Sequence, residues 1–390
     1  MNKEVYRIVL TKQQNKLLFV YLNGSKPVEF HVFSDKKEQL GSIYLGRVQQ
    51  VVSNINASFI DFGENARGFL PRSDLKQGDL IPVQLVKERT KTKDAVLSEE
   101  LSLAGVYSVI HTKDTKLSVS SKLSVQEKKQ LVKSLRETGE GIPYGVIIRT
   151  NAMHADIEEL KKEIRQLSER LSAILKYAGT RTPSSALYRA PAEWMRAVTD
   201  VRLDALTEIV TDEKEIYKNL REHLTDTYGA VYFSSVNLRF YEDSLLPMKK
   251  LYAIESRLKE ALQKKVWLKS GGFLVIEPTE ALVAIDVNTG KTVKKGSREE
   301  TFLLVNIEAA AEIARQLRLR NLSGIILIDF INMEAPASQK KLLAFLAEEL
   351  KKDPIKAQLH DMTTLGLVEV TRMKVRQPLY EQLKDEQKEG

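Results

Sequence analysis

The first part of the chain alternates between apolar and polar residues, which is the pattern of half-buried β-strands. Residues 5–33 show this alternation on both sides of an asparagine–glycine turn at 23–24, so they predict a small antiparallel sheet. Residues 41–88 continue with short apolar runs that are separated by polar turns. The runs are Ile43 to Val52, Ala57 to Phe62, Arg67 to Leu70 and Leu80 to Val86. Strands of this length at this spacing predict a small β-barrel.

The middle of the chain changes to helical spacing. A buried strand is expected at 145–148, and a helix from Asp156 to about Tyr177. The apolar residues of that helix form one stripe, at Ile157, Leu160, Ile164, Leu167, Leu171 and Ile174. The stripe is typical of a helix packed on its own domain or in a helical hairpin, with a coiled-coil seam as the alternative. Residues 179–196 are expected to form a connection, and residues 197–225 a helical segment.

The last third of the chain has the order strand, helix, strand. Two strands, 273–276 and 281–287, precede a capping box at Ser297, which predicts a helix that runs to about Asn321. The elements expected after it are a strand at 325–328, a helix at 338–352 and a strand at 366–371. This order indicates an α/β domain, and the polar residues from 381 onward are expected to be frayed.

Composition narrows the class of protein. The 390 residues exceed one ordinary core, and 43% hydrophobic with 29% charged residues is usual for globular domains. No apolar run approaches the roughly 20 residues of a membrane span, so a cytoplasmic protein without membrane partners is expected. The absence of cysteine and five scattered histidines argue against disulfides and zinc. A net charge of +8 favours polyanions, although a merely basic soluble protein is the alternative.

Two aspartates are candidates for metal chemistry. Asp286 and Asp329 each follow four apolar residues, and Asn288 shares a strand face with Asp286 because side chains alternate along a strand. Buried carboxylates at the same end of neighbouring strands would repel each other unless a cation lay between them. Mg²⁺ suits this role because it takes oxygen ligands and keeps waters for a phosphate substrate. The alternative is that each aspartate caps a helix or pairs with Lys291, Lys294 or Lys295.

Six ordered segments carry a resemblance to a known family. They are GGFLVIEPTEA (271–281), IDVNTG (285–290), EET (299–301), NIEAA (306–310), IARQLRLRNLSG (313–324) and IDFI (328–331). The region resembles the catalytic region of the RNase E/G endoribonucleases, and the resemblance extends from the first strands to about Val375. It implies that Asp286 and Asp329 bind a catalytic Mg²⁺, for which Mn²⁺ can substitute. It also implies that Asn288 hydrogen-bonds near the scissile phosphate.

The activity that the resemblance implies is endonucleolytic cleavage of single-stranded, A/U-rich RNA by metal-activated water. The products would carry 5′-phosphate and 3′-hydroxyl ends, in mRNA decay and rRNA processing. A non-cleaving AU-rich RNA-binding protein of the same fold is the alternative, and the match at Asp286, Asn288 and Asp329 favours the enzyme. A third hypothesis is a scaffold that docks other decay enzymes. The absence of a long disordered tail in this sequence argues against it.

Two RNA contacts are also implied by the resemblance. Phe59 and Phe69 match the stacking aromatics of an OB-fold domain, with Lys93 as a basic neighbour, whereas pattern alone would place each phenylalanine in a core. Arg149 and Thr150 match a sensor for a 5′-monophosphate, which an arginine can hold bidentately. The alternative for Arg149 is a surface arginine that pairs with a helix carboxylate. The family has two consecutive arginines where this chain has Ser121 and Lys122, so Lys122 is a weak contact and sensing is expected to be weaker.

The fold class implied is a multidomain α/β and β protein, an RNase H-like subdomain with an inserted OB-fold barrel and 5′-sensor region, followed by a DNase-I-like α/β catalytic subdomain. The expected boundaries are 1–36 and 197–261 (RNase H-like), 37–99 (OB-fold), 100–196 (5′-sensor), 262–380 (DNase-I-like) and 381–390 (tail). Family members continue with a paired-cysteine zinc link and a small dimerisation domain, and this cysteine-free chain is expected to be a shortened form without them. A monomer and a dimer without zinc both remain open.

Overall fold

A computed structural model describes most of the chain. The described residues are 5–13, 15–34, 40–63, 66–89, 93–120, 123–136, 143–201, 205–225, 233, 235–290 and 297–384. The chain divides into two compact units, one of residues 1–34, 205–219 and 236–390, and the other of residues 35–204 and 220–235. None of the helices in the described part of the chain has the length and apolarity that a membrane span requires.

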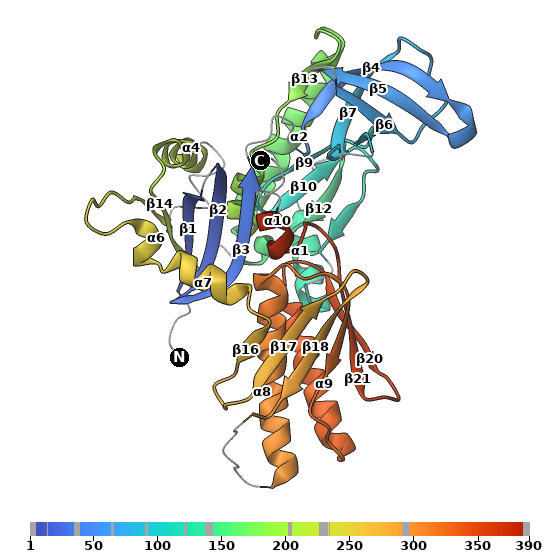
Figure 1. The fold of residues 1–390 in the computed structure, drawn as a ribbon. Helices are drawn as coiled ribbons and strands as arrows, with labels where there is room; N and C mark the ends of the chain where they lie inside the picture. The colour runs from blue at the N-terminus through green and yellow to red at the C-terminus, as the bar shows by residue number, and fades with distance from the viewer. Residues whose placement is uncertain are drawn as a thin grey trace. The chain divides into compact units, whose positions relative to one another are not determined.

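The first unit contains a five-stranded sheet whose strands come from three separate segments of the chain (Figure 1). Its order is β15 (Asn237–Phe240), β14 (Leu206–Thr211), β1 (Tyr6–Gln13), β2 (Lys16–Asn23) and β3 (Lys26–Ser34). The predicted N-terminal antiparallel strands are confirmed, with Gly24 in the left-handed region at φ 56°. The helical prediction for 197–225 was wrong in its centre. There β-branched residues form β14, which pairs in parallel with β1 and precedes α4 (Lys214–Thr225).

The second unit contains the predicted barrel, which closes because β4 pairs with β7. Its strands are β4 (Ile43–Val52), β5 (Ala57–Gly63), β6 (Ala66–Leu70), β8 (Ala95–Ser98) and β7 (Leu80–Lys87). The segment 179–196, predicted to be a connection, instead contains β13 (Ser185–Tyr188), which pairs with β4, and the start of α3 (Glu193–Asp200). Four residues bounded by prolines were too short a pattern to predict as a strand.

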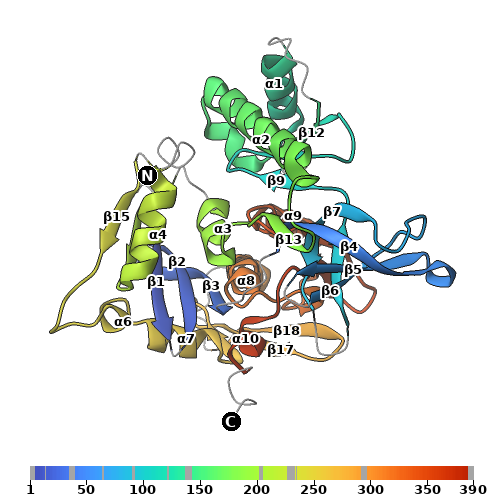
Figure 2. The ribbon, with the colours of Figure 1, turned by 90° about the horizontal axis from the view of Figure 1, so that it is seen from above.

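The remainder of the second unit combines a small sheet with two helices. The sheet is β11 (Leu117–Val119), β12 (Gly145–Ile148), β10 (Ser108–His111) and β9 (Ser102–Ala104), with α1 (Val125–Arg136) and α2 (Ile157–Ala178) beside it. Helix α2 lies beside β9 (Figure 2) and also contacts β10, and its stripe residues Leu160, Ile164 and Leu171 are buried in the core of this region. The own-domain interpretation of this helix is therefore confirmed.

The first unit ends in a six-stranded sheet with helices on one face. The order is β16 (Lys265–Trp267), β17 (Phe273–Pro278), β18 (Leu282–Asn288), β19 (Gly324–Asp329), β21 (Leu367–Arg372) and β20 (Ala357–Met362). The described helices after residue 236 are α6 (Met248–Leu251), α7 (Ile254–Ala261), α8 (Arg298–Leu319), α9 (Pro336–Lys351) and α10 (Leu379–Lys384). β18 and β19 are parallel, and the predicted strand–helix–strand order is confirmed. The end predicted to fray from 381 is helical to 384, anchored by buried Leu379, and 385–390 lie outside the described residues.

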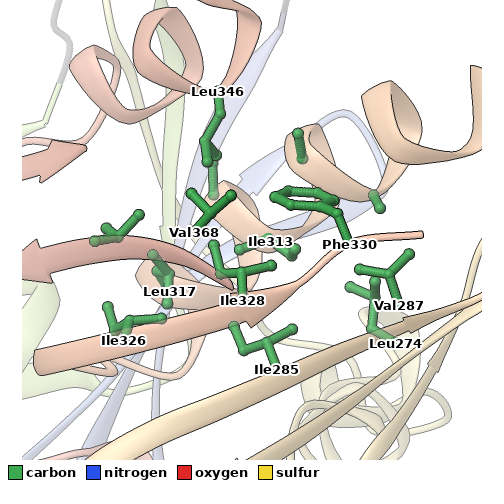
Figure 3. Close-up of a cluster of buried hydrophobic side chains, with 14 of the residues drawn as sticks. Leu274, Ile285, Val287, Ile313, Leu317, Ile326, Ile328, Phe330, Leu346 and Val368 are labelled. Carbon is green, nitrogen blue, oxygen red and sulfur yellow. The ribbon is translucent and has the colours of Figure 1, made fainter. Parts of the chain in front are cut away.

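The core of this sheet lies between the strands and α8 with α9 (Figure 3). The strand side chains that point toward the helices include Ile285 and Val287 of β18 and Ile328 of β19. They pack in one cluster with Ile313 of α8 and Leu346 of α9. Residues between the buried ones point to the opposite face, because successive strand side chains alternate. This open face of the sheet is where the candidate chemistry is found.

Candidate active site and RNA-binding surfaces

Asp286 and Asp329 lie directly beside each other. They are register partners at the ends of the parallel strands β18 and β19, whose backbones are about 4.8 Å apart in a sheet. Asn288 lies on the same face, and its Nδ2 donates a hydrogen bond to Asp286 Oδ2 at 2.7 Å. The structure therefore brings together all three residues that the sequence predicted for catalysis.

The expectation that these carboxylates are buried was wrong. Both aspartates are exposed, because the apolar runs before them alternate between the helix-covered face and the open face of the sheet. Neither forms a salt bridge with any described residue, whereas Lys291, Lys294 and Lys295 lie outside the described residues. Two exposed, adjacent carboxylates keep their oxygens available to an external cation.

The helix-capping alternative does not hold for the two helices nearest in sequence. The capping box of α8 is formed by Ser297 and Glu300, whose side chains each accept from the other's backbone N–H. Glu299 accepts from the backbone N–H groups of Glu334 and Ala335, which lead into α9. Although partial desolvation raises the pKa of Glu299, these backbone hydrogen bonds lower it overall. The aspartates are thus not occupied in capping α8 or α9.

The donor set is small. Within the described ranges, no group of three or more histidine, aspartate or glutamate side chains is arranged to hold a metal ion. Asp286 and Asp329 could hold a cation that needs few protein ligands and fills its other positions with water or phosphate, as Mg²⁺ does. They do not form the closed, multi-ligand cage of a structural metal site.

Polar residues of α8 hold the segments next to the aspartates. Asn306 is fully buried, donates from Nδ2 to the Ile331 carbonyl at 2.8 Å and accepts from the Ile331 N–H at 3.1 Å. This pair of bonds fixes the chain two residues beyond Asp329. No role was predicted for Asn306, although a polar residue on the buried face of a predicted helix could have indicated one.

Two glycines permit a close backbone approach beside Asn288. Gly290 has φ 55°, and a Cβ there would lie 2.3 Å from the Gly271 carbonyl oxygen. A Cβ on Gly272 would lie 2.8 Å from the Asn288 carbonyl oxygen. Real side chains do not tolerate such distances, so the glycines of the 271–290 region keep the β17–β18 pair closed next to the candidate site.

Phe59 and Phe69 form an aromatic pair on the outside of the barrel. They are register partners on β5 and β6, with ring centroids 6.1 Å apart at 72°, and neither belongs to the barrel core. The guanidinium of Arg67 lies 4.5 Å from the Phe59 ring centroid, and it also bonds to Asp94 at 2.8 Å. Exposed Lys93 directly precedes Asp94 in the chain. Arg67 was missed, although its position two residues before Phe69 on one strand places both on the same face.

Arg149 is engaged within the second unit. Its Nη1 donates to the Gly105 carbonyl at 2.6 Å, and its Nη2 pairs with the carboxylate of Asp200 at the end of α3. Pairing with a helix carboxylate was the alternative interpretation, and the structure records that contact. Thr150 Oγ1 lies 3.2 Å from Ser120 Oγ, and Lys122 lies outside the described residues.

Glu163 of α2 anchors the loop that Arg149 contacts. It is 1% exposed and accepts hydrogen bonds from the backbone N–H groups of Val106, Tyr107 and Ser108, at 2.8–3.0 Å for the shortest bond of each. The Ser108 hydroxyl adds a bond at 2.7 Å. Glu163 was not among the residues predicted to matter, although it lies three residues after Leu160 and four before Leu167, on the apolar face of α2.

Comparisons with known proteins agree on one family. A model of the "Ribonuclease E/G family" matches residues 102–375. Ribonuclease G of Haemophilus influenzae is 33% identical over 383 residues, which is 92% of this chain and 77% of the relative. The chain belongs to the ribonuclease E/G family. This membership confirms the predicted resemblance and makes the chain an enzyme by family.

Other members of the ribonuclease E/G family are longer than the matched region. Ribonuclease E of Nostoc sp. is 30% identical over 390 residues, which is 96% of this chain and 56% of the relative. Ribonuclease E of Escherichia coli is 30% identical over 399 residues, which is 96% of this chain and 37% of the relative. The matched region thus spans about half or less of these two ribonucleases E.

Proposed function

We propose that this ribonuclease E/G family member is a metal-dependent endoribonuclease that hydrolyses single-stranded RNA at the open face of the six-stranded sheet. The observation that carries the proposal is the register pairing of Asp286 with Asp329, with Asn288 bonded to Asp286. These oxygens would hold Mg²⁺, or Mn²⁺ as a substitute, with coordination positions left for water and phosphate. When bound, the cation would help generate hydroxide and offset charge on the phosphate.

The protein's own side chains have separate roles in this proposal. Asp286 and Asp329 hold the cation, and Asn288 keeps the Asp286 carboxylate oriented through the 2.7 Å bond. The Asn288 amide has a second N–H hydrogen, which would bond to a non-bridging oxygen of the scissile phosphate. Cleavage would leave a 5′-phosphate and a 3′-hydroxyl.

RNA would be held by stacking and by charge. The proposed platform is formed by Phe59, Phe69, Arg67 and Lys93. The two rings are half-buried outside the barrel core, and rings beside cations bind bases with little sequence demand. A/U-rich single strands, and a role in RNA processing and decay in the cytoplasm, are the proposed substrate class and setting. Arg149 and Thr150 would bind a 5′-monophosphate once the phosphate displaces Asp200 from Arg149.

The subdomain assignment is part of the same proposal. The five-stranded sheet built from 1–36 and 197–261 would be an RNase H-like subdomain, and 37–99 an OB-fold. Residues 100–196 would form the 5′-sensor region, residues 262–380 a DNase-I-like subdomain and residues 381–390 a tail. Parallel β18 and β19 with α8 between them support the α/β character of the catalytic part.

The test is cleavage of 5′-labelled, A/U-rich single-stranded RNA with Mg²⁺ or with EDTA. We expect cutting by the unchanged protein with Mg²⁺ only, and none by Asp286→Asn or Asp329→Asn, which should still bind RNA. Glu277→Gln is the matched control, since it removes an exposed carboxylate from β17 of the same sheet. Wild-type rates in either aspartate variant would remove that residue from the mechanism. RNA binding without cleavage in the unchanged protein would favour the non-cleaving alternative.

The 5′-end proposal has its own comparison. RNA with a 5′-monophosphate should be cut faster than the same RNA with a 5′-hydroxyl, and Arg149→Gln should remove the difference. Equal rates on both substrates in the unchanged protein would contradict the sensor.

A further inference from the structure

The open face of the six-stranded sheet carries an aromatic pair that sequence analysis did not single out. Trp267 on β16 and Phe273 on β17 are register partners, with ring centroids 5.3 Å apart at 61°. Trp267 is 66% exposed, which is unusual for a tryptophan. The rings point away from the core, because the neighbouring residues in each strand, Val266 and Leu274, pack toward the helices and successive strand side chains alternate.

A lysine lies directly over both rings. Lys265 Nζ is 4.2 Å from the Trp267 ring centroid and 3.6 Å from the Phe273 ring centroid. The cation and the rings therefore hold one another in place while each keeps surface toward solvent. An exposed ring next to a fixed positive charge matches the two parts of a nucleotide, a flat base and a phosphate.

The pair is continuous with the candidate active site. In the sheet register Phe273 is opposite Asn288, and Val275 is opposite Asp286. Trp267 lies two strands from β18, which is about 10 Å at the usual strand spacing. All of these side chains share one face, so a strand of RNA whose phosphate reached Asp286 would pass close to the rings.

The hairpin that carries the rings is held by hydrogen bonds to helix α8. Glu308 of α8 accepts hydrogen bonds from the backbone N–H groups of Lys269 and Ser270, at 2.6 and 3.1 Å, in the turn between β16 and β17. Leu268, in the same turn, is buried in the core. The rings are therefore presented on a rigid support, which lowers the entropy lost when a base stacks on them.

We propose that Trp267, Phe273 and Lys265 form a nucleotide-binding subsite for single-stranded RNA, adjacent to the scissile phosphate. A base would stack on the exposed Trp267 ring, and Lys265 would bind a neighbouring phosphate. This inference rests on the proposed function, because it takes Asp286 and Asp329 as the place of cleavage. The subsite would hold the nucleotides next to the cut, and it is built from other residues than the barrel platform at Phe59 and Phe69.

Tryptophan fluorescence can detect the stacking directly. The chain has two tryptophans, and Trp194 is only 8% exposed, so Trp194→Phe leaves Trp267 as the single reporter. In the Trp194→Phe, Asp329→Asn protein, single-stranded oligoribonucleotide should quench Trp267 emission. An abasic oligonucleotide with the same phosphates should not. Equal quenching by both would overturn base stacking at this ring.

Cleavage kinetics test whether the subsite serves the reaction. Trp267→Ala should lower kcat/KM by roughly five- to a hundredfold, mainly through KM, as expected for one lost stacked base, whereas Trp267→Phe should retain most activity. Tyr177→Ala is the matched control, because Tyr177 is also exposed, at 52%, with Lys176 Nζ 5.5 Å from its ring. That ring lies on α2, in the other unit, and its loss should leave the kinetics unchanged.

The outcomes separate the two proposals. If Asp286→Asn abolishes cleavage while Trp267→Ala binds and cuts RNA normally, the subsite is refuted and the proposed function stands. If the aspartate variants cut normally, the proposed function itself fails. A Trp267→Ala protein with normal RNA binding but an altered oligomeric state would assign the rings to a contact between chains, which also overturns the subsite.

Discussion

Asn306 is a buried amide that bonds to the chain two residues beyond the exposed carboxylate of Asp329. Its side chain forms two hydrogen bonds with the backbone of Ile331, two residues after Asp329, where β19 ends. The Asp286 and Asp329 positions were predictable, because each ends an apolar run within a recognisable motif. The role of Asn306 was not, because its partner lies 25 residues away and only the folded chain brings them together.

Asn306→Leu should lower kcat more than it weakens RNA binding. Removing the amide leaves the N–H and carbonyl of half-buried Ile331 without their Asn306 partner, which costs about 1–3 kcal/mol in stability and loosens Asp329. Thermal unfolding, kcat and the Kd for RNA should be measured together. A variant with lowered stability but unchanged kcat would show that Asn306 has no part in positioning Asp329.

Glu163 has the corresponding role in the second unit. Its carboxylate serves the backbone N–H groups of Val106, Tyr107 and Ser108, and the same loop offers the Gly105 carbonyl to Arg149. A glutamate between the apolar residues of a stripe is visible in the sequence. That it faces three backbone donors is not.

Glu163→Ala should destabilise the second unit by about 1–3 kcal/mol or more, since a charge-assisted cluster of bonds is lost. It should also reduce the rate advantage of 5′-monophosphate over 5′-hydroxyl RNA, because Arg149 loses its support. Denaturant unfolding and the ratio of the two cleavage rates are the measurements. Glu158→Ala on the exposed side of α2 is the control, and an unchanged ratio in Glu163→Ala would separate the loop from 5′-end sensing.

At the scale of elements, long periodic segments were predicted well, whereas several short strands were missed. The barrel strands β4, β5, β6 and β7, with α2 and α8, followed from alternation, helical spacing and capping, but the four-residue barrel strand β8 was not predicted. β16 has three residues, and the edge strand β20 is mixed, with a glutamine, a histidine and an aspartate among its six residues, so neither has a pattern that stands out from a loop. β14 was predicted as helix because its pairing with β1 depends on residues about 200 positions earlier.

A buried ion pair joins the end of α9 to β21. Asp353 and Arg372 are 1% and 2% exposed, and Arg372 Nε donates to Asp353 Oδ2 at 2.8 Å. Asn321 and the Leu322 carbonyl accept from the same guanidinium. The pair therefore belongs to a satisfied polar network within the sheet–helix layer.

Asp353→Ala should destabilise the first unit by about 3–5 kcal/mol, because it leaves the Arg372 charge buried without its partner. Glu348→Gln, which breaks the exposed Lys351–Glu348 pair on α9, should change stability by about 0.5 kcal/mol or less. Urea unfolding of both variants gives the comparison. Similar losses in the two would mean that burial does not set the strength of these pairs.

On the scale of the whole molecule, the two units differ in their acid-sensitive groups. Glu29, Glu208 and Glu312 all belong to the first unit. Burial raises the pKa of each of these carboxyl groups, but hydrogen bonds bring it below the usual 4.5. The donor is His31 for Glu29, Arg239 with Arg7 for Glu208, and Arg315 for Glu312. In the second unit, the described carboxyl groups with a clear shift are exposed Asp74, whose pKa Arg72 lowers, and Glu159, whose pKa desolvation raises.

These directions predict that acid weakens the first unit more than the second. A carboxyl whose folded pKa lies below its unfolded value stabilises the fold above that unfolded value, and the stabilisation is lost as pH falls through the folded pKa. Below about pH 4.5, the first unit should therefore lose stability more steeply. The two tryptophans report the units separately, because Trp267 lies in the first and Trp194 in the second.

The measurement is urea unfolding of Trp194→Phe and Trp267→Phe proteins between pH 7 and pH 3. The midpoint reported by Trp267 should fall faster with acidity than the midpoint reported by Trp194. Glu208→Gln and Glu312→Gln should flatten the pH dependence seen by Trp267, because each removes a group that binds a proton on unfolding. Identical midpoints at every pH would contradict the prediction, because the two units would then unfold as one cooperative body.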